Sequence, residues 1–417
     1  MLLLKALRNR TVARLWIGQV GSAIGDEIYR VAFIWMSVSF IGSETGWLAS
    51  LQLLAVVVFG SLGGRWADRW SPYKTMIRVD LLRAVITLTP VVLYYLHFPS
   101  FPALVVSTIL LAGLGAFFDP ALQSILPLAA KDTPTLKAAN GLMSTTLRLA
   151  RVMGPAIIGL LSTFVETIHF FSINAFSYLI STWSVHSIRE EIRHDEKLEH
   201  PQEESVFSNF IESWKLARTK PPVFRGMIMK ATVGAAWYLV YGLGLALLIH
   251  SVSPTDVKAF GLLMGCYGVG NVGAAIIIAN FERRNSERWI YSGLALLGVG
   301  FIFISFTTSF PLLLLVTALT AVGGPLNDLP FSDLVQSEFQ LNKELKKIFR
   351  LRMTLENLLS LLAMLASPFL FRIYGPRNVI LACGVVSFIL SLLAFLWMGP
   401  SKSKRLNLPI QPFSSNV

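Results

Sequence analysis

The chain contains long apolar runs of roughly 20 residues each, separated by short polar breaks. At a rise of about 1.5 Å per residue, a helix of that length crosses the roughly 30 Å hydrocarbon core of a bilayer. Inside that core the backbone must satisfy its own hydrogen bonds, which leaves helices or a closed β-barrel. Because a barrel would show alternating apolar and polar residues, the sequence predicts an all-α membrane protein.

The composition agrees with lipid as the main solvent. Of the 417 residues, 54% are hydrophobic and only 14% are charged, against about 25% charged in typical soluble domains. The net charge of +12 would suggest a nucleic-acid partner in a soluble chain, but here the basic residues gather in alternate loops, as the positive-inside rule requires. We therefore expect no nucleic-acid partner and a multi-pass protein of the bacterial inner membrane, with both termini in the cytoplasm.

Twelve spans can be placed along the chain. They cover residues 13–41, 46–66, 75–97, 101–125, 138–165, 168–188, 223–250, 257–281, 288–308, 310–334, 347–373 and 376–399. The longest polar stretch follows the sixth span and separates two halves of six. We expect a six-helix bundle over 1–187, a cytoplasmic linker with an amphipathic surface helix over 188–222, a second six-helix bundle over 223–400 and a cytoplasmic tail over 401–417. Paired six-span repeats are a transporter architecture with a site near the midplane.

The loop between spans two and three reads GGRWADRWSPYK. Gly64 permits close approach of another helix, and the Asp68 carboxylate can meet the positive end of a neighbouring helix. Charges in the following span and at the end of span four can join them and hold one conformation of the transporter; an ordinary solvated loop is the alternative. The expected conformational gate consists of Gly64, Asp68, Arg69, Asp80, Arg83 and Asp119.

These features resemble the major facilitator superfamily, and within it the drug:proton antiporter branch that holds macrolide efflux proteins and siderophore exporters. The loop keeps the family's Gly and Asp but replaces its later Gly and basic pair with WSPYK. Further matching segments are RLWIGQVGSAIGD, VDLLRA, FFDPALQSILP, ANGLMSTTLRLARVMGPAIIGLL and FSNFIESWKLARTKPPVFRGMI. The resemblance implies twelve transmembrane helices in two pseudo-symmetric six-helix bundles and alternating access to a site between them.

Two glycine-rich segments predict close helix packing. GPAIIG in span five (residues 154–159) is a partial form of the antiporters' Gly-Pro motif and is the main sequence reason for expecting efflux; ordinary helix packing is the alternative. GLLMGCYGVGNVG in span eight (residues 261–273) lies inside a span and has no following Lys-Ser/Thr. It therefore predicts a helix-packing face and not a phosphate loop.

Three ionisable residues lie near the middle of span one: Asp26, Glu27 and Arg30. Placing a charge at that depth costs at least about 2.5–3.5 kcal/mol. Arg30 is four residues after Asp26 and three after Glu27, so it can pair with either on a helix face. One carboxylate is then left over, and it can take up a proton on one side of the membrane and lose it on the other. We expect this group to couple transport to protons, with Asp26 first and Glu27 second; a structural ion network is the alternative.

Span five places Arg148 and Arg151 at a similar depth, three residues apart on one face. Two adjacent guanidinium groups require an anion. It is either a carboxylate of the protein, with Asp26, Glu27, Asp119 and Glu356 as the candidates, or an anionic substrate held in a bidentate pair. Lys230, a third of the way into span seven, is a weaker candidate because its side chain can also extend to the interface. The expected substrate-binding residues are Arg148, Arg151, Glu356 and Lys230.

The sequence supplies no nucleophile paired with a base and no His-rich metal set, so we expect neither an enzyme nor a metal site or cofactor. The expected function is proton-coupled secondary active export of an organic solute. That solute is a siderophore or drug-like compound, anionic or zwitterionic. The alternative is uptake of a nutrient, metal chelate or lysolipid. The expected partners are this substrate, protons and the lipid bilayer, and we expect a monomer.

Overall fold

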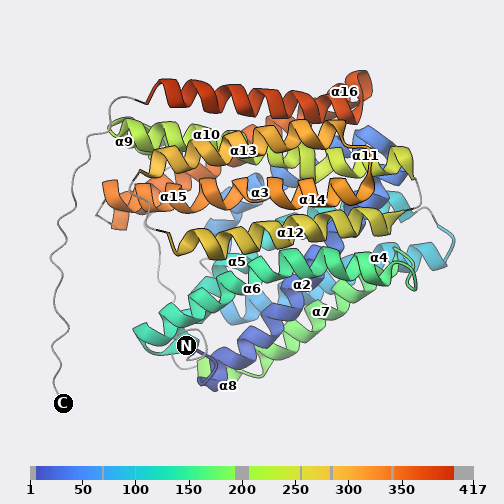
Figure 1. The fold of residues 1–417 in the computed structure, drawn as a ribbon. Helices are drawn as coiled ribbons and strands as arrows, with labels where there is room; N and C mark the ends of the chain where they lie inside the picture. The colour runs from blue at the N-terminus through green and yellow to red at the C-terminus, as the bar shows by residue number, and fades with distance from the viewer. Residues whose placement is uncertain are drawn as a thin grey trace, which may run out of the picture.

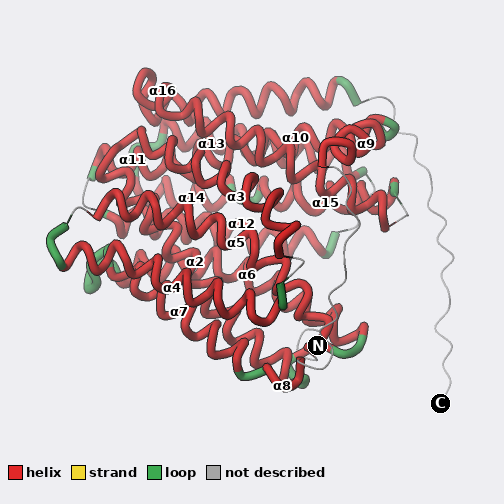
Figure 2. Tube along the Cα trace, turned by 180° about the vertical axis from the view of Figure 1, so that it is seen from behind, coloured by secondary structure: helices red, strands yellow, loops and turns green. Residues whose placement is uncertain are grey.

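The computed structural model describes residues 6–67, 70–98, 100–192, 206–253, 256–281, 285–339 and 342–398. Helices make up nearly all of these residues, joined by short loops (Figure 2). The first bundle contains α2 (Arg10–Ile41), η1 (Gly42–Glu44), α3 (Thr45–Ala67), α4 (Pro72–Tyr95), α5 (Ser100–Ala130), α6 (Thr133–Leu161) and α7 (His169–His186). Two short helices follow, α8 (Arg189–Ile192) and α9 (Val206–Arg218). The second bundle contains α10 (Pro221–Trp237), η2 (Tyr238–Gly244), α11 (Leu245–Val252), α12 (Val257–Ala279), α13 (Ser286–Phe306), α14 (Phe310–Thr320), α15 (Gly323–Glu338) and α16 (Asn342–Leu396).

Polar side chains define where several of these helices begin. Asn9, Asp132, Asp256 and Asn285 each accept a hydrogen bond from a backbone N–H in the first turn of the helix that follows. Such caps satisfy donors that the helix leaves unpaired at its start. The observed boundaries therefore fall within a few residues of those expected from the apolar runs.

Four of the twelve rod-like helical units differ from simple helices. The seventh contains a π-helical segment, η2, between α10 and α11, and the tenth is divided into α14 and α15. The last two form the two arms of α16, which reverse direction at Gly375. Gly375 has a φ of 75°, in the left-handed region that glycine adopts without a Cβ clash.

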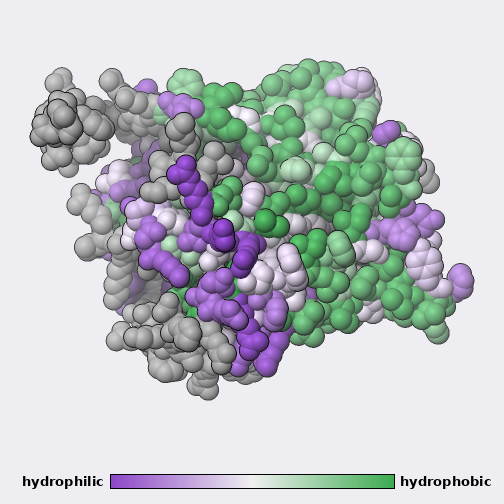
Figure 3. All heavy atoms as spheres, turned by 90° about the horizontal axis from the view of Figure 1, so that it is seen from below, coloured by the Kyte–Doolittle hydropathy of each residue, from purple (hydrophilic) through white to green (hydrophobic). Residues whose placement is uncertain are grey.

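The surface matches a protein surrounded by lipid. Seven stretches of the described residues are long and apolar enough to cross a membrane, and two of these, Arg10–Phe59 and Lys347–Leu396, each contain two rods. The other three long helices, α4, α6 and α7, pack among them and complete the two six-helix bundles. Figure 3 shows a broad hydrophobic surface between two ends where hydrophilic side chains gather.

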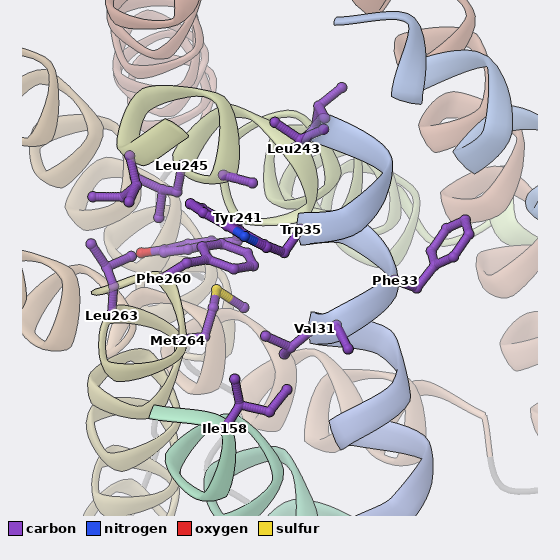
Figure 4. Close-up of a cluster of buried hydrophobic side chains, with 14 of the residues drawn as sticks. Val31, Phe33, Trp35, Ile158, Tyr241, Leu243, Leu245, Phe260, Leu263 and Met264 are labelled. Atoms are coloured by element: carbon purple, nitrogen blue, oxygen red, sulfur yellow. The ribbon is translucent and has the colours of Figure 1, made fainter. Parts of the chain in front are cut away.

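The two bundles are joined at one end of the molecule. Figure 1 shows α9 and α15 at one end of the rods and α11 at the other, which we call the α9 end and the α11 end. At the α11 end one hydrophobic cluster contains residues of both bundles, including Trp35 of α2, Ile158 of α6, Tyr241 of η2 and Phe260 of α12. Figure 4 shows Trp35 directed at Tyr241 and Phe260. The residues nearer the α9 end form two separate clusters, one within each bundle.

Glycines allow α6 and α12 to touch in this joined region. A Cβ added at Gly261 would lie 2.7 Å from the Gly159 backbone nitrogen, and one at Gly268 would lie 2.8 Å from the Val152 Cα. Larger side chains at these positions would hold the two helices apart. The helix-packing face expected for residues 261–273 is therefore confirmed, and Gly159 of the GPAIIG segment lies in the same contact.

Helix α9 is attached to the second bundle. The Trp214 ring meets the Phe224 ring of α10 edge-on at 5.1 Å. Lys347 Nζ, near the start of α16, lies 2.5 Å from Glu212 Oε2. The helix therefore packs its apolar face against the second bundle, at the α9 end.

Candidate functional site

The three charges of α2 point in two directions. Arg30 pairs with Glu27, its Nε lying 2.9 Å from Glu27 Oε2. Arg151 of α6 approaches the other oxygen of Glu27, with Nε at 3.9 Å from Oε1. Asp26 instead accepts a hydrogen bond from the Tyr178 hydroxyl of α7 at 2.5 Å. Arg30 therefore neutralises Glu27, and Asp26 is the carboxylate left without an arginine on its own helix.

Asp26 belongs to a second group of charges inside the first bundle. Arg83 of α4 lies 3.6 Å from Asp80 Oδ1, measured at Nη1, and its charge also acts on Asp26 and on Asp119 of α5. We call Asp26, Asp80, Arg83 and Asp119 the inner acidic cluster. The cluster contains three carboxyl groups and one guanidinium group. At mid-depth, such an excess of acid favours binding of protons.

Buried aromatic rings fix the position of Arg83 in this cluster. Its guanidinium carbon lies 4.7 Å from the centre of the Phe118 ring and 5.5 Å from that of Tyr178. Asp80 is fully buried, and its oxygens accept no hydrogen bond of normal geometry from the described residues. Asp26, in contrast, is exposed at the middle of its helix. Asp119 is exposed as well, so Asp26 and Asp119 are the two members of the cluster that are placed to exchange a proton with water.

The residues expected to form a gate do not all lie within the described structure. Asp68 and Arg69 lie outside the described residues, and the side-chain surroundings of Gly64 are not described. Asp80 and Arg83 form an ion pair whose charges reach Asp26 and Asp119. The structure therefore brings the last three expected gate residues together with the first expected proton-coupling residue.

The second bundle has its own network of charges. Lys230 of α10 forms ion pairs with Asp328 of α15 and with Glu356 of α16, at 3.9 Å in the second case. Arg352 Nη1 lies 4.0 Å from the other oxygen of Glu356. The Lys230 side chain is only 8% exposed, so the expectation that it can extend to the interface is wrong. The two nearby carboxylates hold it inside.

Aromatic side chains lie between the charges of the two bundles. Trp237 Nε1 donates a hydrogen bond to the Tyr267 hydroxyl at 2.7 Å, and the Arg30 guanidinium carbon lies 5.5 Å from the centre of the Trp237 ring. Tyr267 lies close enough to both Arg151 and Asp328 to interact with their charges. Residues of both bundles therefore surround one polar region, which we call the central site.

The two arginines of α6 are differently placed. Arg151 lies in the central site, and its side chain is 63% exposed. Arg148 is also exposed and forms no ion pair with any described residue. Glu356, considered as an internal partner for this pair, is instead held by Lys230 and Arg352. The α6 arginines therefore retain capacity for an external anion.

Several members of these clusters are not among the predicted site residues. Tyr178, Tyr267 and Trp237 are aromatic residues of a kind that apolar helices commonly contain. Arg352 carries a spacing signal, because it lies four residues before Glu356 and can pair with it on a helix face. Asp328 carries another, because it follows Gly and Pro in its helix as Asp119 follows Gly in the corresponding helix of the first half.

Two further features bear on possible ligands. A cavity of about 590 Å³ lies between α10 and the two arms of α16, and it is lined almost entirely by apolar residues such as Ala236, Leu239 and Val386. None of its lining residues is charged, so it is distinct from the central site. Within the described residues, no three His, Cys, Asp or Glu side chains form a group that could hold a metal ion.

Comparison with known proteins gives a consistent result. The chain matches the Major Facilitator Superfamily over residues 15–343 and 253–414. The multidrug efflux pump Tap of Mycolicibacterium fortuitum is 26% identical over 316 residues, which cover 72% of this chain and 75% of Tap.

Solved structures share the fold at low sequence identity. A bacterial homologue of the iron transporter ferroportin, in an inward-facing state, has a TM-score of 0.72 at 14% identity, covering 92% of this chain and 98% of that one. A D-xylose–proton symporter has a TM-score of 0.69 at 12% identity, covering 95% and 99%.

Proposed function

Since the chain belongs to the Major Facilitator Superfamily, and is therefore a multi-pass membrane transporter, we propose that it exports an organic solute in exchange for protons. The substrate is a siderophore or drug-like compound, anionic or zwitterionic. Export is favoured by the Gly-Pro segment of α6 and by the similarity to an efflux pump. The membrane is the bacterial inner membrane, with the α9 end and both termini in the cytoplasm, as the distribution of basic loops favours.

One observation carries the proton-coupling part of the proposal. Asp26 is exposed at mid-depth, is held by Tyr178 and shares a single arginine with two other carboxylates. A carboxylate in that position can bind a proton when Arg83 is engaged by its neighbours and release it when Arg83 turns to Asp26. Glu27 and Arg30 are a neutral pair, so they position Arg151 and do not compete for the proton.

Transport then requires the two bundles to separate at the α11 end and to come into contact at the α9 end. Residues 1–187 and 223–400 form the two moving units, and residues 188–222 connect them. In the conformation observed, the α11 end is sealed by the cluster around Trp35 and Phe260, and the cargo reaches the central site from the α9 end. Protonation of Asp26 from the opposite side drives the return step. The gate residues around Asp68 hold the alternative conformation, and a monomer suffices for the cycle.

The direction of transport is tested with membrane vesicles of known orientation. An exporter concentrates substrate in inverted vesicles when their interior is acidified, and does not concentrate it in right-side-out vesicles when the medium outside them is acidified. Accumulation in right-side-out vesicles would instead establish uptake, the alternative function. In both preparations, dissipating the pH gradient with a protonophore should abolish accumulation; accumulation that survives would contradict proton coupling.

A further inference from the structure

We propose that the substrate is a zwitterion that lies across the central site, with its carboxylate at Arg151 on α6 and its ammonium group at Asp328 on α15. This inference rests on the proposed function, because it describes the cargo of the same site. It narrows an anionic or zwitterionic solute to one class and gives that solute an orientation.

The wall formed by the first bundle is positively charged. Arg30 and Arg151 both approach one carboxylate, that of Glu27, and Arg148 is exposed one turn before Arg151 on the same helix. Glu27 is shared between two of these arginines, and Arg151 is held only at 3.9 Å. Arg151 is also the most exposed of the three partners in this contact. This wall therefore offers a guanidinium fork to a carboxylate, the group that arginine binds in bidentate geometry.

The wall formed by the second bundle presents an acid. Its four charges, two positive and two negative, balance, but they are unequally exposed. The Lys230 side chain is 8% exposed and that of Asp328 is 45% exposed, while Arg352 and Glu356 lie between these values. The cation is thus covered and the carboxylate of Asp328 is accessible. A ligand on this side meets a hydrogen-bond acceptor with negative charge.

An aromatic surface lies between Arg151 on the first wall and Asp328 on the second. Tyr267 of α12 interacts electrostatically with Arg151 and with Asp328, so it lies near both. Its hydroxyl accepts a hydrogen bond from Trp237, whose ring faces Arg30. The flat part of an aromatic or heterocyclic ligand can pack on these rings while its two charged ends reach the two walls.

A ligand with a single charge fits this arrangement less well. A simple anion at Arg151 would displace water from Asp328 and leave that carboxylate with Lys230 as its partner, and the loss of a charged hydrogen bond is costly. A simple cation at Asp328 would lie near the surplus positive charge of the α6 wall. Only a ligand with both charges satisfies both walls.

The test compares three probes that share one ring system and differ in which charged group they carry. Norfloxacin is an aromatic zwitterion, its decarboxylated analogue is a cation, and its N-acetyl analogue is an anion. Equilibrium binding of each to the purified full chain is measured from probe fluorescence, with no proton gradient. The zwitterion should bind about tenfold or more tightly than either analogue, the effect of one charged hydrogen bond. Equal affinities, or no binding of any of the three, would overturn the proposal.

Two substitutions test the orientation. Asp328→Asn should weaken binding of the zwitterion and the cation about tenfold and leave the anion unaffected, and Asp328→Glu should restore both. Arg151→Gln should weaken binding of the zwitterion and of the anion and leave binding of the cation unaffected. Substitutions that weaken binding of all three probes equally would overturn the assignment of the carboxylate to Arg151 and of the ammonium group to Asp328. Binding without a gradient is independent of transport, so failure of proton coupling in vesicles would leave this result standing, and the reverse also holds.

Discussion

Replacing Gly261 by alanine should force the two bundles apart at the α11 end. The new Cβ would lie 2.7 Å from the Gly159 backbone nitrogen and 3.1 Å from the Pro155 carbonyl oxygen. Both are backbone atoms of α6 and cannot rotate away, so the clash costs about 1–3 kcal/mol, as overpacking typically does. The cost falls only on the conformation in which α6 and α12 touch. The population open at the α11 end should therefore rise about 5- to 150-fold.

The chain offers a matched control one turn further along α12. A Cβ at Gly265 would lie 3.6 Å from the Ala156 Cα, an ordinary van der Waals contact. Gly265→Ala changes the same helix by the same methyl group without a clash. It should leave the conformational equilibrium within about twofold of the parent, which corresponds to less than about 0.5 kcal/mol.

The populations can be measured by electron–electron double resonance between two spin labels. Phe164, after α6, and Val252, at the end of α11, are 84% and 71% exposed and belong to different bundles. Both are replaced by labelled cysteines after Cys266 and Cys383 are changed to alanine. The parent should give one short distance, and Gly261→Ala should add a longer one. Identical distance distributions for Gly261→Ala and Gly265→Ala would refute the reasoning.

Three other substitutions test the charges and the packing. Asp26→Asn should abolish substrate accumulation driven by a pH gradient but preserve substrate counterflow in proteoliposomes; gradient-driven accumulation at the parent rate would exclude a coupling role. Gly270→Ala should lower stability by about 1–3 kcal/mol because its Cβ would overlap a backbone carbonyl oxygen of α14, whereas Gly273→Ala, with nothing within 4 Å, should not. Thermal unfolding measures both, and equal melting temperatures would contradict the packing. Removing one partner of a fully buried ion pair lowers the free energy of unfolding by about 3–5 kcal/mol. Lys230→Met should lower it by less, because Asp328 is 45% exposed. Adding Asp328→Asn should recover part of the loss, and a further loss would argue against the ion pair.

Much of the fold follows from the local pattern of the sequence. Apolar runs of membrane-spanning length and polar capping residues such as Asn9 and Asp132 locate the helix ends within a few residues. The π-helical segment η2 was not predicted, because Tyr238–Gly244 is as apolar as an ordinary helix. Its altered hydrogen bonding depends on packing in the second bundle, and the spacing of residues along the sequence does not indicate it.

The candidate site was predictable in most of its charged members, Asp328 and Arg352 excepted, but not in its pairings. Arg30 lies three residues from Glu27 and four from Asp26, and helix geometry permits either ion pair. The choice is made by groups far away in the sequence: Arg151 approaches Glu27, and Tyr178 holds Asp26. For the same reason, sequence spacing could not assign Glu356 to Lys230 in place of the α6 arginines.

The central claim is that Asp26 exchanges a proton for cargo, and substrate-induced proton release measures this most directly. Norfloxacin is added to purified protein in weakly buffered detergent solution at a pH where Asp26 is protonated, and the solution pH is recorded. The parent protein should release close to one proton per bound substrate, and Asp26→Asn should bind substrate without releasing any. Substrate binding to the parent with no proton release, or equal release from the Asp26→Asn protein, would contradict the claim.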